Sequence, residues 1–160
     1  MAVVDSYSAE YTDKYIDVPP SLIKANKEAK VKGMFAYVVP GASDAGATLY
    51  MLRPPAGSRW NGKGWIWSTA LGTGATVAVG TGITGAGVAA DTDKFLAATS
   101  HASATKTDLG PVAIITADLA AAVVGELYEF DGETDVIITT AGHALAGTEK
   151  VALYFEVTLP

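Results

Sequence analysis

From residue 33 onward, the chain consists of short apolar runs that glycine and proline interrupt. Residues 34–39 are almost entirely apolar and end at Pro40-Gly41, which is typical of a buried strand followed by a turn. Residues 150–159 alternate instead between apolar and polar, and alternate side chains of a strand share one face. That face would carry Val151, Leu153, Phe155, Val157 and Leu159. Both patterns predict β-strands rather than helices.

The same signals recur between turn residues along the rest of the chain. They predict further strands at residues 47–52, 58–70, 75–80, 111–116, 125–130 and 134–140. Glycine, alanine and serine dominate residues 81–110, where we expect a long connection with one helical turn at 93–98. The tally of about eight strands predicts an all-β fold, an antiparallel β-sandwich of jelly-roll-like type.

The segment at residues 58–70 has two interpretations. Asn61-Gly62 is a strong turn dipeptide, so the segment could split into a hairpin of its own. Trp65 and Trp67 alternate with Ile66 beyond it, which favours one bulged strand. The two tryptophans share a face. We expect that face to belong to the sandwich core, with a protein–protein interface as the alternative.

Residues 1–32 differ from the rest and are predicted to form an extended N-terminal arm before a body at 33–160. Tyr7, Tyr11 and Tyr15 recur at four-residue spacing, which would also suit one face of a helix. Pro19-Pro20 then forces extension, and residues 21–30 could form one short helix. We expect the arm to become ordered against a partner, with the three tyrosines as contacts.

Charge and composition exclude several classes of partner. The chain has 160 residues, 49% of them hydrophobic and 18% charged, with no cysteine and a net charge of −6. The first 32 residues are balanced, so the whole negative excess lies on the body, and nucleic acid is not an expected partner. Neither a signal peptide nor a membrane-spanning segment is visible, which indicates synthesis in a cytoplasm and no membrane partner.

Catalytic and metal chemistry lacks a convincing set of residues. His101 and His143 are the only histidines, and both are expected in solvated loops. The glycine-rich runs at 71–76 and 80–85 are expected to be turns, because no amphipathic helix follows them to complete a phosphate site. A cluster of carboxylates near residue 130 is expected to occupy solvated turns; it comprises Glu126, Glu129, Asp131, Glu133 and Asp135. The sequence therefore predicts no enzyme, no metal and no cofactor.

Arg59 and Trp60 form a candidate partner-binding pair. Arginine and tryptophan are the usual anchors of protein interfaces. An exposed tryptophan could equally stack on a sugar, so a carbohydrate-binding or host-attachment module is the alternative function.

The order of segments resembles a family of small head proteins of tailed bacteriophages, the capsid decoration or cement proteins. The resemblance lies in GMFAYVVP (33–40), ATLY (47–50), PAGSR (55–59), ALGTGATVAVG (70–80), DKFLAA (93–98), TDVIITTAG (134–142) and the final strand. It implies a jelly-roll-like body in the virion, forming homotrimers on the outer capsid surface with the major capsid protein as partner. It implies no catalytic residues, and it does not extend to residues 1–32.

Overall fold

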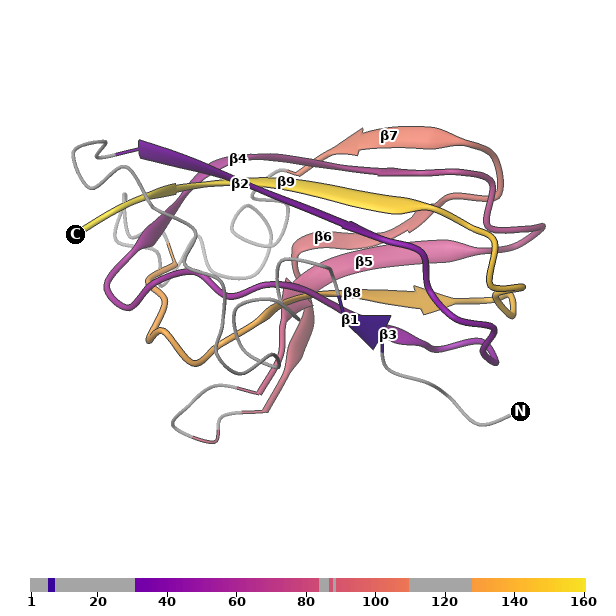
Figure 1. Cartoon of the computed structure of the whole chain (residues 1–160), viewed down its shortest axis with the longest axis horizontal. Helices are drawn as coiled ribbons and strands as arrows, with labels where there is room; N and C mark the ends of the chain where they lie inside the picture. The colour runs from indigo at the N-terminus through magenta and orange to yellow at the C-terminus, as the bar shows by residue number, and fades with distance from the viewer. Residues whose placement is uncertain (1–5, 8–30, 84–86, 88, 110–127) are drawn as a thin grey trace, which may run out of the picture.

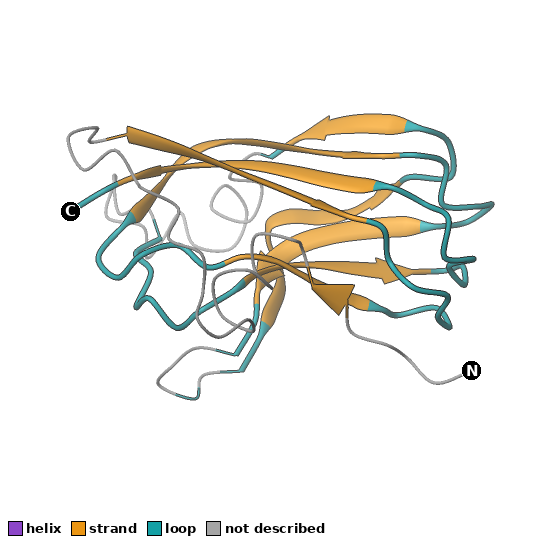
Figure 2. Cartoon of the chain, in the orientation of Figure 1, coloured by secondary structure: helices purple, strands orange, loops and turns teal. Residues whose placement is uncertain are grey.

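Nine strands and no helix make up the described part of the chain, which in this computed structural model comprises residues 6–7, 31–83, 87, 89–109 and 128–160. Figure 2 shows strands joined by short loops throughout this part. The strands are β1 (Ser6–Tyr7), β2 (Val31–Val38), β3 (Thr48–Leu52), β4 (Arg59–Ser68), β5 (Thr76–Thr81), β6 (Asp91–Ser100), β7 (Thr105–Asp108), β8 (Val136–Ala141) and β9 (Val151–Thr158).

The strands form two sheets that pack face to face (Figure 1). One sheet has the order β2-β9-β4-β7, and the other has β1-β3-β8-β5-β6. If β2 to β9 are counted as eight successive strands, each sheet takes the interleaved order of a jelly roll, in which two Greek keys close around one core. The predicted β-sandwich and its jelly-roll character are confirmed.

The core is apolar and contains a compact group of aromatic rings. Trp60 stacks on Phe155 with 5.6 Å between ring centroids, and Phe95 meets both rings edge-on at 4.8 and 5.0 Å. Offset and edge-to-face pairs of this kind stabilise a core beyond their area of burial. Because the three rings come from β4, β6 and β9, they tie one sheet to the other.

The prediction for residues 81–110 is wrong. This segment contains two strands, β6 and β7, in place of a long connection with a helical turn. Phe95 and Leu96 of β6 are buried, as their apolar character suggested, but they lie in a strand that pairs with β5. Small residues with little intrinsic preference take their conformation here from the neighbouring strand. The strand predicted at 111–116 lies outside the described residues, and only Tyr128–Phe130 of the one at 125–130 are described.

The prediction of one bulged strand at 58–70 is confirmed. Strand β4 pairs with β9 on both sides of a register shift between Trp60 and Gly64. Beyond the bulge, Ile66 is fully buried, whereas Trp65 and Trp67 are partly exposed on the outer face. The expectation that the two tryptophans belong to the core is therefore wrong. Successive residues of a strand point to opposite faces. Because Ile66 points inward, its neighbours Trp65 and Trp67 point outward.

Two short parts of the predicted N-terminal arm are described, residues 6–7 and 31–32, and both lie in strands. Ser6 and Tyr7 form β1, which pairs in parallel with Leu49 and Tyr50 at the edge of β3. The next described strand, β2, begins at Val31, two residues before the predicted start of the body. Tyr11, Tyr15 and the short helix predicted at residues 21–30 lie outside the described residues.

Candidate functional site

The predicted pair Arg59 and Trp60 is divided between the surface and the core. Trp60 is 1% exposed, and its indole N–H donates to the backbone carbonyl of Lys63 over 3.0 Å. Its ring therefore cannot act as a surface platform for a sugar or a partner, and that part of the prediction is wrong. Neighbouring residues of a strand point to opposite faces, so Arg59 lies outside.

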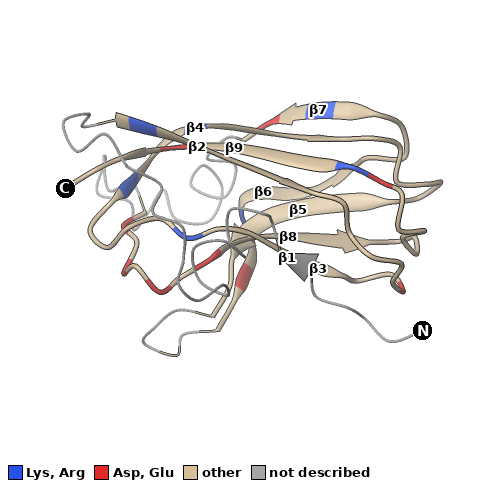
Figure 3. Ribbon diagram, viewed as in Figure 1, with Lys and Arg blue, Asp and Glu red and all other residues tan. Residues whose placement is uncertain are grey.

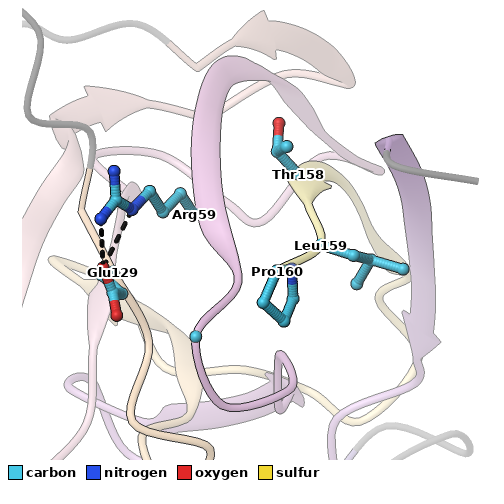
Figure 4. A pocket seen from close by; sticks show the side chains of 6 residues that line it. Arg59, Glu129, Thr158, Leu159 and Pro160 are labelled. Carbon is cyan, nitrogen blue, oxygen red and sulfur yellow. Dashed lines mark hydrogen bonds and ion pairs between the residues drawn. The ribbon is translucent and has the colours of Figure 1, made fainter.

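Arg59 borders an open depression at the end of the sandwich where the chain terminates (Figure 4). Its guanidinium lies 2.7 Å from the carboxylate of Glu129, and both side chains are more than half exposed. An ion pair as exposed as this one contributes little to stability, so a partner can compete for either group. The depression has a volume of about 410 Å³ and is lined by Gly57, Arg59, Glu129, Thr158, Leu159 and Pro160.

A second candidate surface lies on the outside of the β2-β9-β4-β7 sheet. Five partly or well exposed aromatic residues share this side, and we call them the aromatic face: Phe35, Tyr37, Trp65, Trp67 and Tyr154. The strand register places Tyr154 directly between Phe35 and Trp65. Tyr37 and Trp67 lie likewise on either side of Ala152. The face is thus continuous across three strands.

Three rings of the aromatic face, those of Phe35, Trp65 and Tyr154, contact one another. Trp65 stacks on Tyr154 at 5.9 Å, and Phe35 reaches Trp65 at 6.1 Å. The ammonium of Lys106 lies 5.7 Å from the centre of the Trp65 ring, within the range of a cation–π contact. Tyr154 donates to Glu156 over 3.1 Å, and burial together with this carboxylate raises the pKa of the phenol. The phenol therefore stays protonated at neutral pH.

Part of the aromatic face corresponds to an apolar run that is visible in the sequence. Odd-numbered and even-numbered positions are both apolar in residues 34–39, which we interpreted as a buried strand. Strand β2 lies instead at a sheet edge, with Met34, Ala36 and Val38 inside and the residues between them outside. In a two-layer sandwich the outer face of a strand has no second sheet against it, so half of an apolar run stays uncovered, and the packing of the two sheets is needed to see this.

His101 is buried rather than solvated, which contradicts the prediction. Its side chain lies between two hydroxyls, with Nδ1 2.7 Å from Ser68 Oγ and Nε2 3.1 Å from Thr107 Oγ1. Its backbone N–H also donates to Ala75. Burial lowers the pKa of the imidazole, so the ring is neutral at neutral pH. His143 is exposed, as predicted.

Acidification below neutral pH is expected to destabilise the fold through His101. The unfolded chain binds a proton near pH 6.5, whereas the folded chain resists protonation until the pH is lower. Stability is therefore complete above pH 6.5 and falls below it, by at most about 1.4 kcal/mol per pH unit for this group. Urea unfolding between pH 7.5 and 5 measures the slope. The variant His101→Gln should show a smaller slope than the parent chain, and equal slopes in the two proteins would contradict the assignment.

Two of the described carboxylates near residue 130, Asp131 and Asp135, have structural partners. Asp131 accepts hydrogen bonds from the backbone N–H groups of Glu133 and Thr134, as expected of a turn. Asp135 differs from the prediction, because it is 6% exposed and forms a bidentate pair with Arg53 at 2.7 and 2.9 Å. Glu126 lies outside the described residues. Within the described ranges, no group of three or more acidic or histidine side chains is placed to hold a metal ion.

The two glycine-rich runs have different roles. Gly72 and Gly74 adopt positive φ angles in the turn before β5, as predicted. Gly80 lies within β5 itself, where the backbone of β6 passes against it, so its expected role as a turn residue is wrong. Among the described residues there is no helix of the length and apolar character needed to cross a membrane.

Comparison with known proteins finds similarity at the level of the fold. No family model and no curated protein matches this sequence. A chain of the structure "Capsid of Ralstonia phage GP4" aligns over 99% of both chains, with a TM-score of 0.64 and 13% identity. A chain of "Cyanophage Pam1 capsid asymmetric unit" aligns over 88% of this chain and 92% of its own length, with a TM-score of 0.59 and 17% identity. At such low identity, the alignments establish a shared fold.

Proposed function

We propose that this chain is a structural protein of a phage virion that binds the outer surface of the capsid and bridges neighbouring capsid subunits. The observation that carries the proposal is the fold shared with a chain of a phage capsid over 99% of both lengths. In this proposal the major capsid protein is the partner, the copies assemble as homotrimers, and no catalytic centre or cofactor takes part.

The described surface fits such a role. A protein on a repeating lattice gains affinity from many simultaneous contacts, so it needs broad surfaces rather than a deep pocket. The aromatic face and the open depression beside Arg59 are surfaces of this kind. A net charge of −6 suits the outside of a shell better than an interior filled with DNA. The tyrosines of the arm, Tyr7, Tyr11 and Tyr15, are proposed as additional contacts.

Reconstitution tests the proposal. Purified protein is added to particles that lack it, and the particles are then imaged by electron cryo-microscopy and heated. We expect density at the local three-fold positions on the outside of the shell, and a higher temperature for particle disruption. A protein lacking residues 1–20 should bind more weakly if the arm is a tether. Failure of the full chain to bind shells, or density only on the tail, would contradict the proposal.

Host attachment through carbohydrate is the second candidate, because Trp67 and Tyr37 expose ring surface on the aromatic face. Sugars stack on free ring faces, yet Trp65 and Tyr154 use theirs on each other. A glycan array with the parent chain and Trp67→Ala separates the two functions. Binding to a glycan that Trp67→Ala abolishes would favour attachment, whereas an empty array favours the capsid role.

A further inference from the structure

The bulge of β4 contains a chemically reactive dipeptide, Asn61-Gly62. The backbone nitrogen that follows an asparagine can attack the side-chain amide carbon, and glycine hinders this attack least because it has no Cβ atom. Asparagine is for this reason one of the thermolabile residues of proteins. The chain has two asparagines, and the other, Asn26, precedes lysine. Asn61 is therefore the asparagine of this chain that is most open to the reaction.

The fold leaves room for the attack at Asn61. Residues 61–63 fall within the register shift of β4, so they have no opposite residue in the described pairing with β9. Gly62 adopts a φ angle of +82°, and a Cβ atom placed on it would meet nothing within 4 Å. Asn61 and Gly62 are both partly exposed, so water has access to them. A cyclic imide of these two residues thus has open space on its outer side.

Two partners hold the side-chain amide of Asn61, one at each end. The backbone N–H of Lys63 donates to Oδ1 over 3.1 Å, and Nδ2 donates to the carboxylate of Glu156. A donor faces the oxygen and an acceptor faces the nitrogen, which fixes the orientation of the amide. The N–H of Lys63 also lies where negative charge develops on Oδ1 when Gly62 attacks. A donor fixed at such a position stabilises the transition state.

We infer that Asn61 is a site of spontaneous deamidation and that the product loosens the bulge against β9. The nitrogen of Gly62 bonds to Cγ of Asn61 and gives its proton to water, while the Cγ–Nδ2 bond breaks and the leaving group takes a proton from water to become ammonia. Water then opens the cyclic imide at either carbonyl, which gives aspartate or isoaspartate. The reaction consumes water alone, without an oxidant or reductant, and makes the net charge of −6 more negative by one.

Glu156 makes the product unfavourable in the folded chain. Its side chain is 17% exposed and also accepts a hydrogen bond from the phenol of Tyr154 over 3.1 Å. After deamidation, a carboxylate faces Glu156 in place of the donor Nδ2. Like charges on adjacent strands repel each other, and a hydrogen bond to a charged group is lost. Figure 3 shows charges of both signs on β4 and β9. The ammonium of Lys63, 3.9 Å from Glu156 and itself 74% exposed, offsets only part of the repulsion.

The bulge is also connected to the core. The indole N–H of Trp60 donates to the carbonyl of Lys63 over 3.0 Å, and the Trp60 ring stacks on Phe155 between the sheets. Isoaspartate adds a carbon atom to the main chain between these two hydrogen-bonded residues, so it displaces the carbonyl from the indole. The inference goes beyond the proposed function, because deamidation is a property of the isolated chain. Failure to bind shells would contradict the proposed function and leave deamidation unaffected.

Incubation of the purified full chain at mildly alkaline pH tests the chemistry. Peptides are analysed by mass spectrometry for the gain in mass that replaces NH₂ by OH. We expect this gain to increase with first-order kinetics at Asn61, and much faster there than at Asn26. The dipeptide Asp131-Gly132 does not interfere, because isomerisation of an aspartate leaves the mass unchanged. The variant Asn61→Ser should show no gain in the corresponding peptide. No gain at Asn61, or an equal rate at Asn26, would overturn the assignment of the site.

Matched variants test the effect on the fold. Asn61→Asp reproduces one product, whereas Asn61→Ser removes the contact with Glu156 without adding a charge. In urea unfolding at neutral pH, we expect the folding equilibrium constant of Asn61→Asp to lie about tenfold below that of Asn61→Ser. Glu156→Gln added to Asn61→Asp restores a donor opposite the new carboxylate and should recover most of this loss. Equal stability of the two single variants, or no recovery in the double variant, would show that the product does not loosen the bulge.

Discussion

Replacement of Trp60 by alanine is expected to destabilise the folded chain by about 3–5 kcal/mol, the usual cost of removing a large buried aromatic side chain. The ring is 1% exposed and contacts Phe95 and Phe155 from two other strands. Its loss leaves a cavity between the sheets, which the surrounding strands can fill only in part. Such a loss is a large fraction of the stability of a domain of this size. The midpoint and slope of urea unfolding measure the change.

Trp67→Ala provides the matched control, because it removes the same side chain from the same strand. Trp67 lies on the outer face and is partly exposed, so we expect a much smaller loss of stability. The comparison separates the effect of burial on stability from the effect of the residue type. Similar losses for the two variants would contradict the placement of Trp60 in the core and of Trp67 outside it.

Gly80→Ala is expected to produce the second large effect. A Cβ atom at this position would overlap the backbone carbonyl oxygen of Asp91 and the carbonyl carbon of Thr92. Backbone atoms cannot rotate away as a flexible side chain can, so β5 and β6 would have to separate locally. Forcing extra atoms into a packed site costs about 1–3 kcal/mol and occasionally more. Hydrogen exchange should show the opening confined to β5 and β6, alongside a lower urea midpoint.

Gly41→Ala controls for the loss of a glycine as such. A Cβ atom at Gly41 meets nothing within 4 Å, and this glycine does not adopt a positive φ angle. We therefore expect a change close to zero or a slight gain in stability, since alanine restricts the unfolded chain. If Gly80→Ala proved as harmless as Gly41→Ala, the close packing of β6 against β5 would be wrong.

The aromatic residues show how far the sequence carries a functional prediction. The alternation Trp65-Ile66-Trp67 identified a strand and showed that the tryptophans share a face. It did not show whether that face is the inner or the outer one, because an alternating pattern looks the same for both faces. Large aromatic residues are usual in cores, which favoured the inner face. Trp60 illustrates the opposite error. Beside Arg59 it resembled a surface anchor, but the rings of Phe95 and Phe155 surround it, and they come from segments far away in the sequence.

The wrong predictions for His101 and for the β6–β7 region have a different cause. A histidine among alanine, serine and threonine has the local appearance of a loop residue. Its burial depends on Ser68 and Thr107, which the pairing of β4 with β7 brings to its two ring nitrogens. In the same way β6 is a strand because β5 lies beside it. Long-range pairing decides such segments, since local preference for strand is weak and depends on context.

The sequence by itself determined the all-β class, the sandwich, the bulge in β4 and the turn at Gly72 and Gly74, because alternation and backbone freedom are local properties. Tertiary structure alone decided which parity of each strand faces inward and which strand lies at an edge. Strand β2 depends on both. Its apolar run is visible in the sequence, but only the packing of the two sheets shows that half of this run remains uncovered. Burial is a property of neighbours, and the neighbours of β2 come from the other end of the chain.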